Sequence, residues 1–372
     1  MKAAGQTLTE APGVVTDRAS ADTSRREGNT IGSMTIVDLH THAHFPSFYS
    51  RSRLPWRYRA TRRLASFVRQ TGCQPDAMGV GRINAMVTAI YPPEIRLWSE
   101  RTFREHALAE LAAVRDLVEE CRDRLLLAAS PRDLQPVDTG GRVALIPALE
   151  GGHCLGGEVA ALDDFHSLGV RVFQPAHWID NRCVRAERSW RGRGRPLEPF
   201  GREAVRRAIR LGMVVDVAHM ASRALGEVLD LAPGRVIDSH ACVRELCPVS
   251  RNRTLGEIRG LAASGGMIGI NFFPPYLKRK ARKAPVSRVA EHIDAAVEAA
   301  GPEQVGIGSD RWGIPFMADG LDGPSGLQLL ARQLDRRGYP PEAVRGILGE
   351  NFLRFWTEVV ARKRGGTYAE RL

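Results

Sequence analysis

The sequence predicts a (β/α)8 barrel, the TIM-barrel architecture of the α/β class. Short apolar segments alternate with longer amphipathic segments along the chain, which is typical of repeated βα units. Eight of the apolar segments are almost continuously hydrophobic, as expected for parallel strands that are covered on both faces. Ionisable residues stand at the C-terminal ends of six of these segments, on the face where a barrel gathers its functional residues.

The eight predicted strands follow one another through most of the chain. They are TIVDLH (35–40), INAMVTAIY (83–91), VALIPALE (143–150), VRVFQPAH (170–177), MVVDVAH (213–219), RVIDSH (235–240), GMIGINFF (266–273) and VGIGSD (305–310). Between them, residues 103–127 and 201–212 carry helical patterns. A doubly wound open sheet is the alternative, but no G-x-G-x-x-G turn follows the first strand.

Length and composition indicate a globular protein with a full core. The chain has 372 residues, of which 43% are hydrophobic and 26% are charged. These values exclude a disulfide miniprotein, a collagen-like chain and a mostly disordered chain. We expect a flexible N-terminal leader at residues 1–33, one barrel domain at 34–360 and a C-terminal tail at 361–372.

The sequence favours a cytoplasmic protein without a membrane partner. It holds no run of about 18 apolar residues, which a membrane-spanning helix needs, and its N-terminal residues lack the apolar region of a signal peptide. The six cysteines form no C-x-x-C pair. In a chain of this length, reduced thiols are the expected state.

The formal net charge of +11 comes mainly from arginine. Basic residues are dense at 51–69, 182–195 and 278–283. This charge could attract nucleic acid or another polyanion, or it could simply form a solvated arginine-rich surface. No helix-turn-helix, zinc-finger or RNP-like pattern accompanies it, so we expect no nucleic-acid partner.

The ionisable residues at the predicted strand ends suggest a metal site. The first strand closes with Asp38-Leu39-His40-Thr41-His42. Residues two apart on a strand point to the same side, so His40 and His42 can converge on one ion. Imidazole suits zinc and similar metals. Glu150, at the end of the third strand, offers a carboxylate that can bridge two cations.

Two more strand ends complete the predicted centre. His219 and His240 can bind a second ion, and a two-metal site lowers the pKa of a shared water and polarises a carbonyl group. Asp310, at the end of the last strand, is placed to move protons, although a helix N-cap or an ion-pair partner is its ordinary role. The remaining histidines are interpreted as surface, cap or core residues: His44, His106, His153, His166 and His292.

Longer motifs occur in a fixed order along the chain. They are ALEGGH (148–153), PFGREAVRRAIRLGMVVDVAHMA (199–221), SHACVRELCPVSRNR (239–253), GGMIGINFF (265–273), GIGSD (306–310) and GILGENFLRFW (346–356). Together with the first-strand motif, they resemble the membrane dipeptidase (renal dipeptidase) family of the amidohydrolase superfamily, from about residue 34 to about residue 360. The resemblance implies a barrel of the metallo-dependent hydrolase type.

The resemblance implies a metallo-dipeptidase with two zinc ions per chain. Its expected reaction is hydrolysis of a dipeptide by a hydroxide that bridges the two metals. The family's first metal would lie at His40 with His42 beside it, and Glu150 would bridge to a second metal held by His219 and His240. The resemblance also implies a homodimer as the candidate assembly.

Three further residues receive roles from the same resemblance. His177 matches a histidine that binds substrate and donates a hydrogen bond to the tetrahedral oxyanion. Arg251 matches an arginine that grips the terminal carboxylate of the substrate, a role suited to the guanidinium fork. Asp310 matches the proton-shuttling aspartate, which also contacts the substrate.

The chain departs from the family pattern near the expected site. His42 replaces the aspartate of a His-x-Asp motif, which raises the net charge of the site by one unit. The segment 182–200 is basic where family members tend to be acidic. Arg311-Trp312 stands where the family usually carries a second aspartate after the one matched by Asp310.

Two other functions remain open at the level of sequence, and we rank both below the dipeptidase. A divergent amidohydrolase, such as a lactonase, a deaminase or a specialised amidase, could use the same histidines around one or two metals. A non-catalytic protein could instead bind a polyanion through its arginine-rich surface, in which case binding would weaken steeply with salt.

Overall fold

The computed structural model describes residues 34–50, 83–95, 97–134, 141–187, 194–322 and 326–364. The predicted leader at 1–33, the basic segment at 51–69 and residues 365–372 of the predicted tail lie outside this part of the chain. The described residues from Thr35 onward belong to one compact unit, which holds the fold described below.

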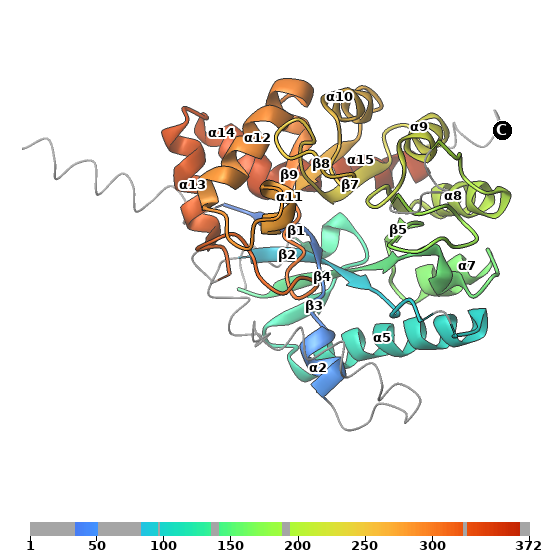
Figure 1. Cartoon of the computed structure of the whole chain (residues 1–372). Coiled ribbons are helices and arrows are strands. Elements are labelled where there is room, and N and C mark those ends of the chain that lie inside the picture. Colours follow the sequence, from blue (N-terminus) through green and yellow to red (C-terminus); the bar gives the residue numbers. More distant parts are fainter. Residues whose placement is uncertain are drawn as a thin grey trace, which may run out of the picture. The chain divides into compact units, whose positions relative to one another are not determined.

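Eight parallel strands close into a barrel (Figure 1). They are β1 (Ile36–Thr41), β2 (Ile83–Ile90), β4 (Val143–Glu150), β5 (Val172–Gln174), β6 (Val214–Asp216), β7 (Val236–Ala241), β8 (Met267–Ile270) and β9 (Val305–Ile307). β1 pairs with both β2 and β9, and β2 pairs directly with β4, so the ring has no open edge. All eight predicted strand segments are present, and the (β/α)8 prediction is confirmed.

One short strand lies beside the ring and corrects the predicted helix at 103–127. Helix α5 (Glu100–Glu120) ends earlier, and β3 (Leu125–Leu127) pairs with the first residues of β4. Three consecutive leucines satisfy either a helical or a strand pattern. Here pairing with β4 selects the strand conformation, because Val143 N donates to Arg124 O at 2.7 Å and Ala128 N donates to Leu145 O at 2.9 Å.

Helices lie between and outside the strands (Figure 1). They are α2 (Phe45–Ser50), α5, α7 (Ala161–Ser167), α8 (Pro199–Leu211), α9 (Ser222–Leu231), α10 (Leu255–Ala263), α11 (Pro274–Leu277), α12 (Val286–Ala300), α13 (Gly326–Arg336), α14 (Pro341–Arg345) and α15 (Asn351–Arg364), with short helical turns at Pro131–Leu134, Gly152–Leu155, Pro302–Gln304 and Gly346–Glu350. The predicted helix at 201–212 corresponds to α8, which begins with Pro199 and is capped by Gly212 in the left-handed conformation. No helix in the described ranges is long and apolar enough to cross a membrane.

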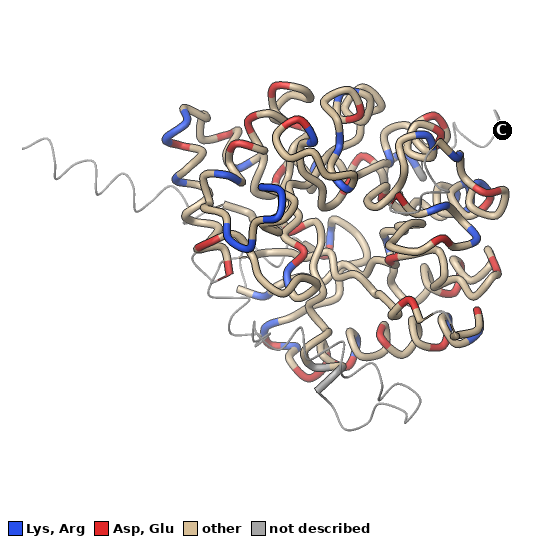
Figure 2. The backbone as a smooth tube through the Cα atoms, in the orientation of Figure 1, with Lys and Arg blue, Asp and Glu red and all other residues tan. Residues whose placement is uncertain are grey.

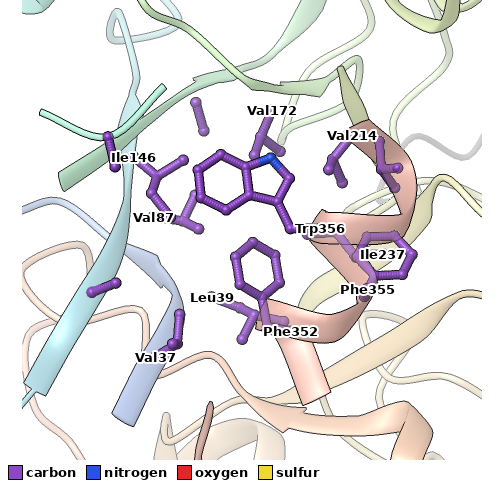
Figure 3. Close-up of a cluster of buried hydrophobic side chains, with 14 of the residues drawn as sticks. Val37, Leu39, Val87, Ile146, Val172, Val214, Ile237, Phe352, Phe355 and Trp356 are labelled. Atoms are coloured by element: carbon purple, nitrogen blue, oxygen red, sulfur yellow. The ribbon is translucent and has the colours of Figure 1, made fainter. Parts of the chain in front are cut away.

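The apolar core fills the barrel on the side of α15 (Figure 3). Trp356 and Phe352 are each 1% exposed, and they pack with strand residues such as Leu39 and Val214. Burial of each such side chain contributes roughly 1.5–3 kcal/mol relative to leaving it in water. With this volume occupied by apolar groups, the polar side chains gather where the strands end. On the outside, basic and acidic residues are interspersed over the helices (Figure 2).

Candidate metal centre and active site

Five histidines surround the carboxylate of Glu150, the last residue of β4. They present Nε2 to its two oxygens at 3.5 Å (His40), 3.5 Å (His42), 3.7 Å (His177), 3.9 Å (His219) and 4.0 Å (His240). Glu150 itself is 2% exposed. The structure thus brings together every residue that the sequence proposed as a metal ligand, and it places His177 in the same group.

Three strands end earlier than predicted, so His177, His219 and Asp310 lie in the loops that follow them. β5 ends at Gln174, before His177, because Pro175 has no N–H to continue the sheet. β6 ends at Asp216 and β9 at Ile307. The residues that follow turn sharply, and His219 and Asp310 have positive φ angles of 62° and 59°. These turns bring their side chains over the mouth of the barrel.

The donor set fits metal ions. His40 Nε2 and Glu150 Oε2 are fully buried and make no hydrogen bond within the described residues. Ligand atoms lie within 4.8 Å of one another in the group His40, His42 and Glu150, and in the group Glu150, His177 and His219. Imidazole nitrogens with a carboxylate are a typical zinc set. One carboxylate shared by two groups of histidines suits two neighbouring ions.

The histidines differ in their tendency to hold a proton. Burial lowers the pKa of His219 and His240 well below the ordinary value, and nearby positive charges lower it further. Burial also lowers the pKa of His42 to about 3. These imidazoles are neutral near pH 7 and offer the lone pair that a metal requires. Burial would lower the pKa of His40 too, but the charge of Glu150 outweighs it and raises that pKa to about 9.

Glu150 is the negative group of the centre. Burial would raise its pKa, but the positive charges on His40 and His177 outweigh this effect and hold the pKa well below the usual range. Its amide neighbour is Gln174, whose Nε2 donates to Oε1 of Glu150 at 3.2 Å. Glu150 is therefore held in its ionised form near neutral pH.

Asp310 lies beside His42 at the edge of the centre. Its Oδ1 is 3.7 Å from His42 Nε2, and its backbone N donates to His40 O at 2.9 Å. Burial raises the pKa of this carboxyl group to about 6. A carboxyl group with a pKa near the working pH is suited to accept and return a proton.

Arg251 places a buried guanidinium with two unused nitrogens beside the centre. The residue is 5% exposed, and its Nη2 donates to His240 O at 2.7 Å. Its Nε and Nη1 are buried and make no hydrogen bond with a described residue. The nearest carboxylate oxygen, on Asp238, is 4.0 Å from Nη1. A buried cation with free N–H groups is an anion site, and its fork matches a carboxylate.

Two segments depart from the family pattern, 182–200 and Arg311-Trp312. The described basic residues named below have structural partners. Arg311 donates to Asp322 O at 2.8 Å and to Leu321 O at 2.7 Å, so its side chain stabilises the loop between residues 311 and 322. In the loop after β5, Arg182 pairs with Glu100 at 3.2 Å, and Arg185 pairs with Glu198 at 3.0 Å. Residues 188–193 of the predicted basic segment lie outside the described ranges.

Four of the five remaining histidines belong to the interior, as expected. Their partners are Glu110 for His44 and His106, Pro92 O for His153, and the backbone of Val243 and Leu277 for His292. All four are buried.

Sequence reasoning missed three polar residues that border the centre. Asp216 has a carboxylate oxygen within 4.8 Å of His40 and His240 nitrogens. Ser239 stands 2.7 Å from His240 Nδ1, and Glu94 stands 3.1 Å from His177 Nδ1. Asp216 and Ser239 lie in predicted strands next to site residues, which was the available signal. For Glu94 the sequence carries no signal, because its partner is 83 residues away.

A parallel barrel that gathers histidines and a carboxylate at the C-terminal ends of its strands defines the class of metallo-dependent hydrolases. Within this class, the chain belongs to the membrane dipeptidase family, peptidase family M19, whose family model matches residues 37–367. The resemblance found in the sequence is confirmed.

Named relatives carry dipeptidase descriptions. An uncharacterised dipeptidase of Schizosaccharomyces pombe is 32% identical over 67% of this chain and 64% of its own length. The dipeptidase tcpJ of Claviceps purpurea is 32% identical over 65% of this chain and 57% of its own. The match thus spans less than two thirds of each of these relatives.

Solved structures share the fold. The probable dipeptidase PvdM from Pseudomonas aeruginosa superposes with a TM-score of 0.80 at 21% identity, covering 92% of this chain and 99% of that one. A metallopeptidase of family M19, dipeptidase AC, superposes with a TM-score of 0.77 at 22% identity, covering 87% and 99%. At these identities the likeness establishes the barrel.

Proposed function

We propose that this protein is a zinc-dependent dipeptidase that hydrolyses the peptide bond of dipeptides. One observation carries the proposal: a cluster of five histidines around Glu150 lies beside the guanidinium of Arg251, whose Nε and Nη1 make no hydrogen bond with a described residue. The first feature suits metal-assisted hydrolysis, and the second suits a substrate that ends in a free carboxylate. The dipeptidase names of the two relatives support the same reading.

Two zinc ions are proposed per chain. His40, His42 and Glu150 would hold the first ion, and Glu150 with His219 and His240 would hold the second. His219 Nε2 and His240 Nε2 are 3.0 Å apart, so the two ring nitrogens are close enough to bind one ion. When bound, the ions supply an acidified water and polarise the carbonyl group of the substrate.

The remaining site residues bind the substrate and move protons. Arg251 would receive the C-terminal carboxylate in its fork. His177, whose Nε2 faces the centre, would donate a hydrogen bond to the oxyanion that forms at the scissile carbonyl. Asp310 would carry a proton to the departing amine, and its pKa of about 6 suits that exchange near neutral pH.

Location and assembly complete the proposal. The five described cysteines are unpaired, and four of them are buried. Reduced thiols are typical of the cytoplasm, so we place the enzyme there. We also propose a homodimer, as the family resemblance implies, with a small-molecule dipeptide as the working partner and no role for nucleic acid.

The test is a panel of dipeptides and their C-terminal amides, with L- and D-residues at the second position, incubated with zinc-loaded protein. We expect cleavage of dipeptides and not of their amides. Glu150→Gln should lose bound metal and activity together. Glu203→Gln, an exposed change on α8, is the matched control and should keep both. Metal-loaded, folded protein that cleaves no dipeptide, or Glu150→Gln protein that retains full metal and activity, would refute the proposal.

A further inference from the structure

Glu94 is a buried acid beside the centre to which the proposed mechanism gives no role. It lies four residues after the end of β2, in a loop, and its side chain is 6% exposed. One carboxylate oxygen is 3.1 Å from His177 Nδ1, and the other accepts a hydrogen bond from Ile179 N at 3.2 Å. Both contacts are with the loop that follows β5, so Glu94 joins two loops at the mouth of the barrel.

The ring of His177 has one nitrogen on Glu94 and the other on the centre. Its Nε2 lies 3.7 Å from Glu150 Oε1. Tyr91 packs against the ring with 4.3 Å between centroids, and Trp178 stacks almost parallel to it, with an angle of 7°. The two aromatic rings fix the plane of the imidazole. They do not fix which edge of the ring, and so which nitrogen, faces Glu94.

The carboxylate makes that distinction. An ionised carboxylate only accepts hydrogen bonds, so Nδ1 of His177 carries a hydrogen and donates it to Glu94, and Nε2 donates to the oxyanion in the imidazolium form, in which both nitrogens carry a hydrogen. A half-turn of the ring about its Cβ–Cγ bond would place carbon atoms where the two nitrogens now lie. Glu94 would then keep a buried charged oxygen without a partner, which costs about 1–3 kcal/mol or more. The observed orientation is therefore the stable one.

We propose that Glu94 is a positioning residue that locks the imidazole of His177 with Nε2 directed at the reacting carbonyl. The inference rests on the proposed dipeptidase function, because it assigns the means by which His177 is presented to substrate. Histidines that bind or activate at metal centres commonly have a carboxylate on the remote nitrogen, and loss of such a partner costs about 10- to 100-fold.

The kinetic test uses a double-mutant cycle in zinc-loaded protein. Glu94→Ala should lower kcat about tenfold or more with little change in KM, and Glu94→Asp should recover part of the loss. In a His177→Ala background, Glu94→Ala should have no further effect on kcat, because its action passes through His177. Bound zinc, measured in every variant, should stay at the wild-type level.

A spectroscopic test does not require activity. With ¹⁵N-labelled histidine, the His177 resonances are identified by their absence from the His177→Ala protein. We expect a proton on Nδ1 in the wild-type protein, and loss of that single pattern in Glu94→Ala. If this pattern is found but dipeptides are not cleaved, the proposed function fails and the positioning role stands.

Two results would overturn the positioning role while leaving the dipeptidase assignment intact. One is Glu94→Ala protein that cleaves dipeptides at the wild-type kcat. The other is an equal loss from Glu94→Ala in the wild-type and His177→Ala backgrounds, which would indicate that Glu94 only supports the loop. Glu94→Gln, which keeps the size of the side chain, repeats the comparison if Glu94→Ala does not fold.

Discussion

The hydroxyl oxygen of Ser239 lies 2.7 Å from Nδ1 of His240, the next residue along β7. The same oxygen is 3.3 Å from Nδ1 of His40 on β1. The two imidazole rings lie nearly face to face, with centroids 3.7 Å apart. One hydroxyl group thus faces the remote nitrogen of a histidine at each proposed metal position. This arrangement leaves Nε2 of both rings directed at Glu150, at 3.5 Å for His40 and 4.0 Å for His240.

Removal of this hydroxyl group should weaken metal binding. In Ser239→Ala, neither Nδ1 keeps its partner, so both rings gain freedom to rotate away from the centre. We expect metal affinity to fall about 10- to 100-fold, measured by competition with a chromophoric chelator. Ser264→Ala, which removes a hydroxyl group at the end of α10, is the control. Superimposable titrations for wild-type and Ser239→Ala proteins would contradict the prediction.

The two guanidinium nitrogens of Arg251 that make no hydrogen bond with a described residue predict a dependence on the free carboxylate of the substrate. A hydrogen bond to a charged partner contributes about 1.5–3 kcal/mol, so Arg251→Met should lower kcat/KM for dipeptides about 10- to 100-fold. Arg251→Lys should restore little, because lysine lacks the two-pronged donor. For a dipeptide amide, which has no carboxylate, the variant and the wild-type protein should be equally poor. Equal losses on both substrates would assign Arg251 to support of His240 instead.

The eight strands and the convergence of their terminal histidines could be predicted because both follow from local pattern. Hydrophobic runs identify the strands, and parallel barrels place strand ends on one face. The contacts of Ser239 with His40 and of Glu94 with His177 could not, because they span 199 and 83 residues and use common polar side chains. β3 was misassigned for a related reason, since its state depends on the edge of β4.

Acid should destabilise the fold through His292. This residue is fully buried on α12, and its Nδ1 accepts from Val243 N while its Nε2 donates to Leu277 O, both at 3.0 Å. Burial lowers its pKa from 6.5 to about 4. The folded state therefore binds the proton less readily than the unfolded chain, and stability falls as the pH drops from 6.5 to 4.

The size of this effect follows from the shift, which corresponds to about 3 kcal/mol when complete. Urea unfolding at pH 7 and at pH 4.5 gives the free energy of unfolding that each protein loses in acid. This loss should be smaller by about 2–3 kcal/mol in His292→Leu than in the wild-type protein. His166→Gln, a change of a partly exposed histidine on α7, should leave the loss as it is in the wild type. An unchanged loss in His292→Leu would show that other groups dominate acid unfolding.

The close packing of the helical turn Gly346–Glu350 against the start of β1 depends on the absence of a side chain at Gly349. A Cβ atom at this position would lie 2.3 Å from Thr35 O and 2.7 Å from Val37 N, both backbone atoms at the start of β1. Neither atom can move without displacing β1, which carries His40 and leads to His42. Gly349→Ala should therefore lower the free energy of unfolding by about 1–3 kcal/mol, measured by urea denaturation.

Gly226→Ala provides the opposite case within the same fold. Gly226 lies inside α9, and a Cβ atom at this position would have no described atom within 4 Å apart from those of its chain neighbours and its own helix backbone. Alanine is the better helix former by about 1 kcal/mol, so this substitution should raise stability. If both substitutions shift stability in the same direction, packing against β1 does not explain the effect at position 349. If Gly349→Ala also weakens metal binding while Gly226→Ala does not, the position of β1 controls the geometry of the centre.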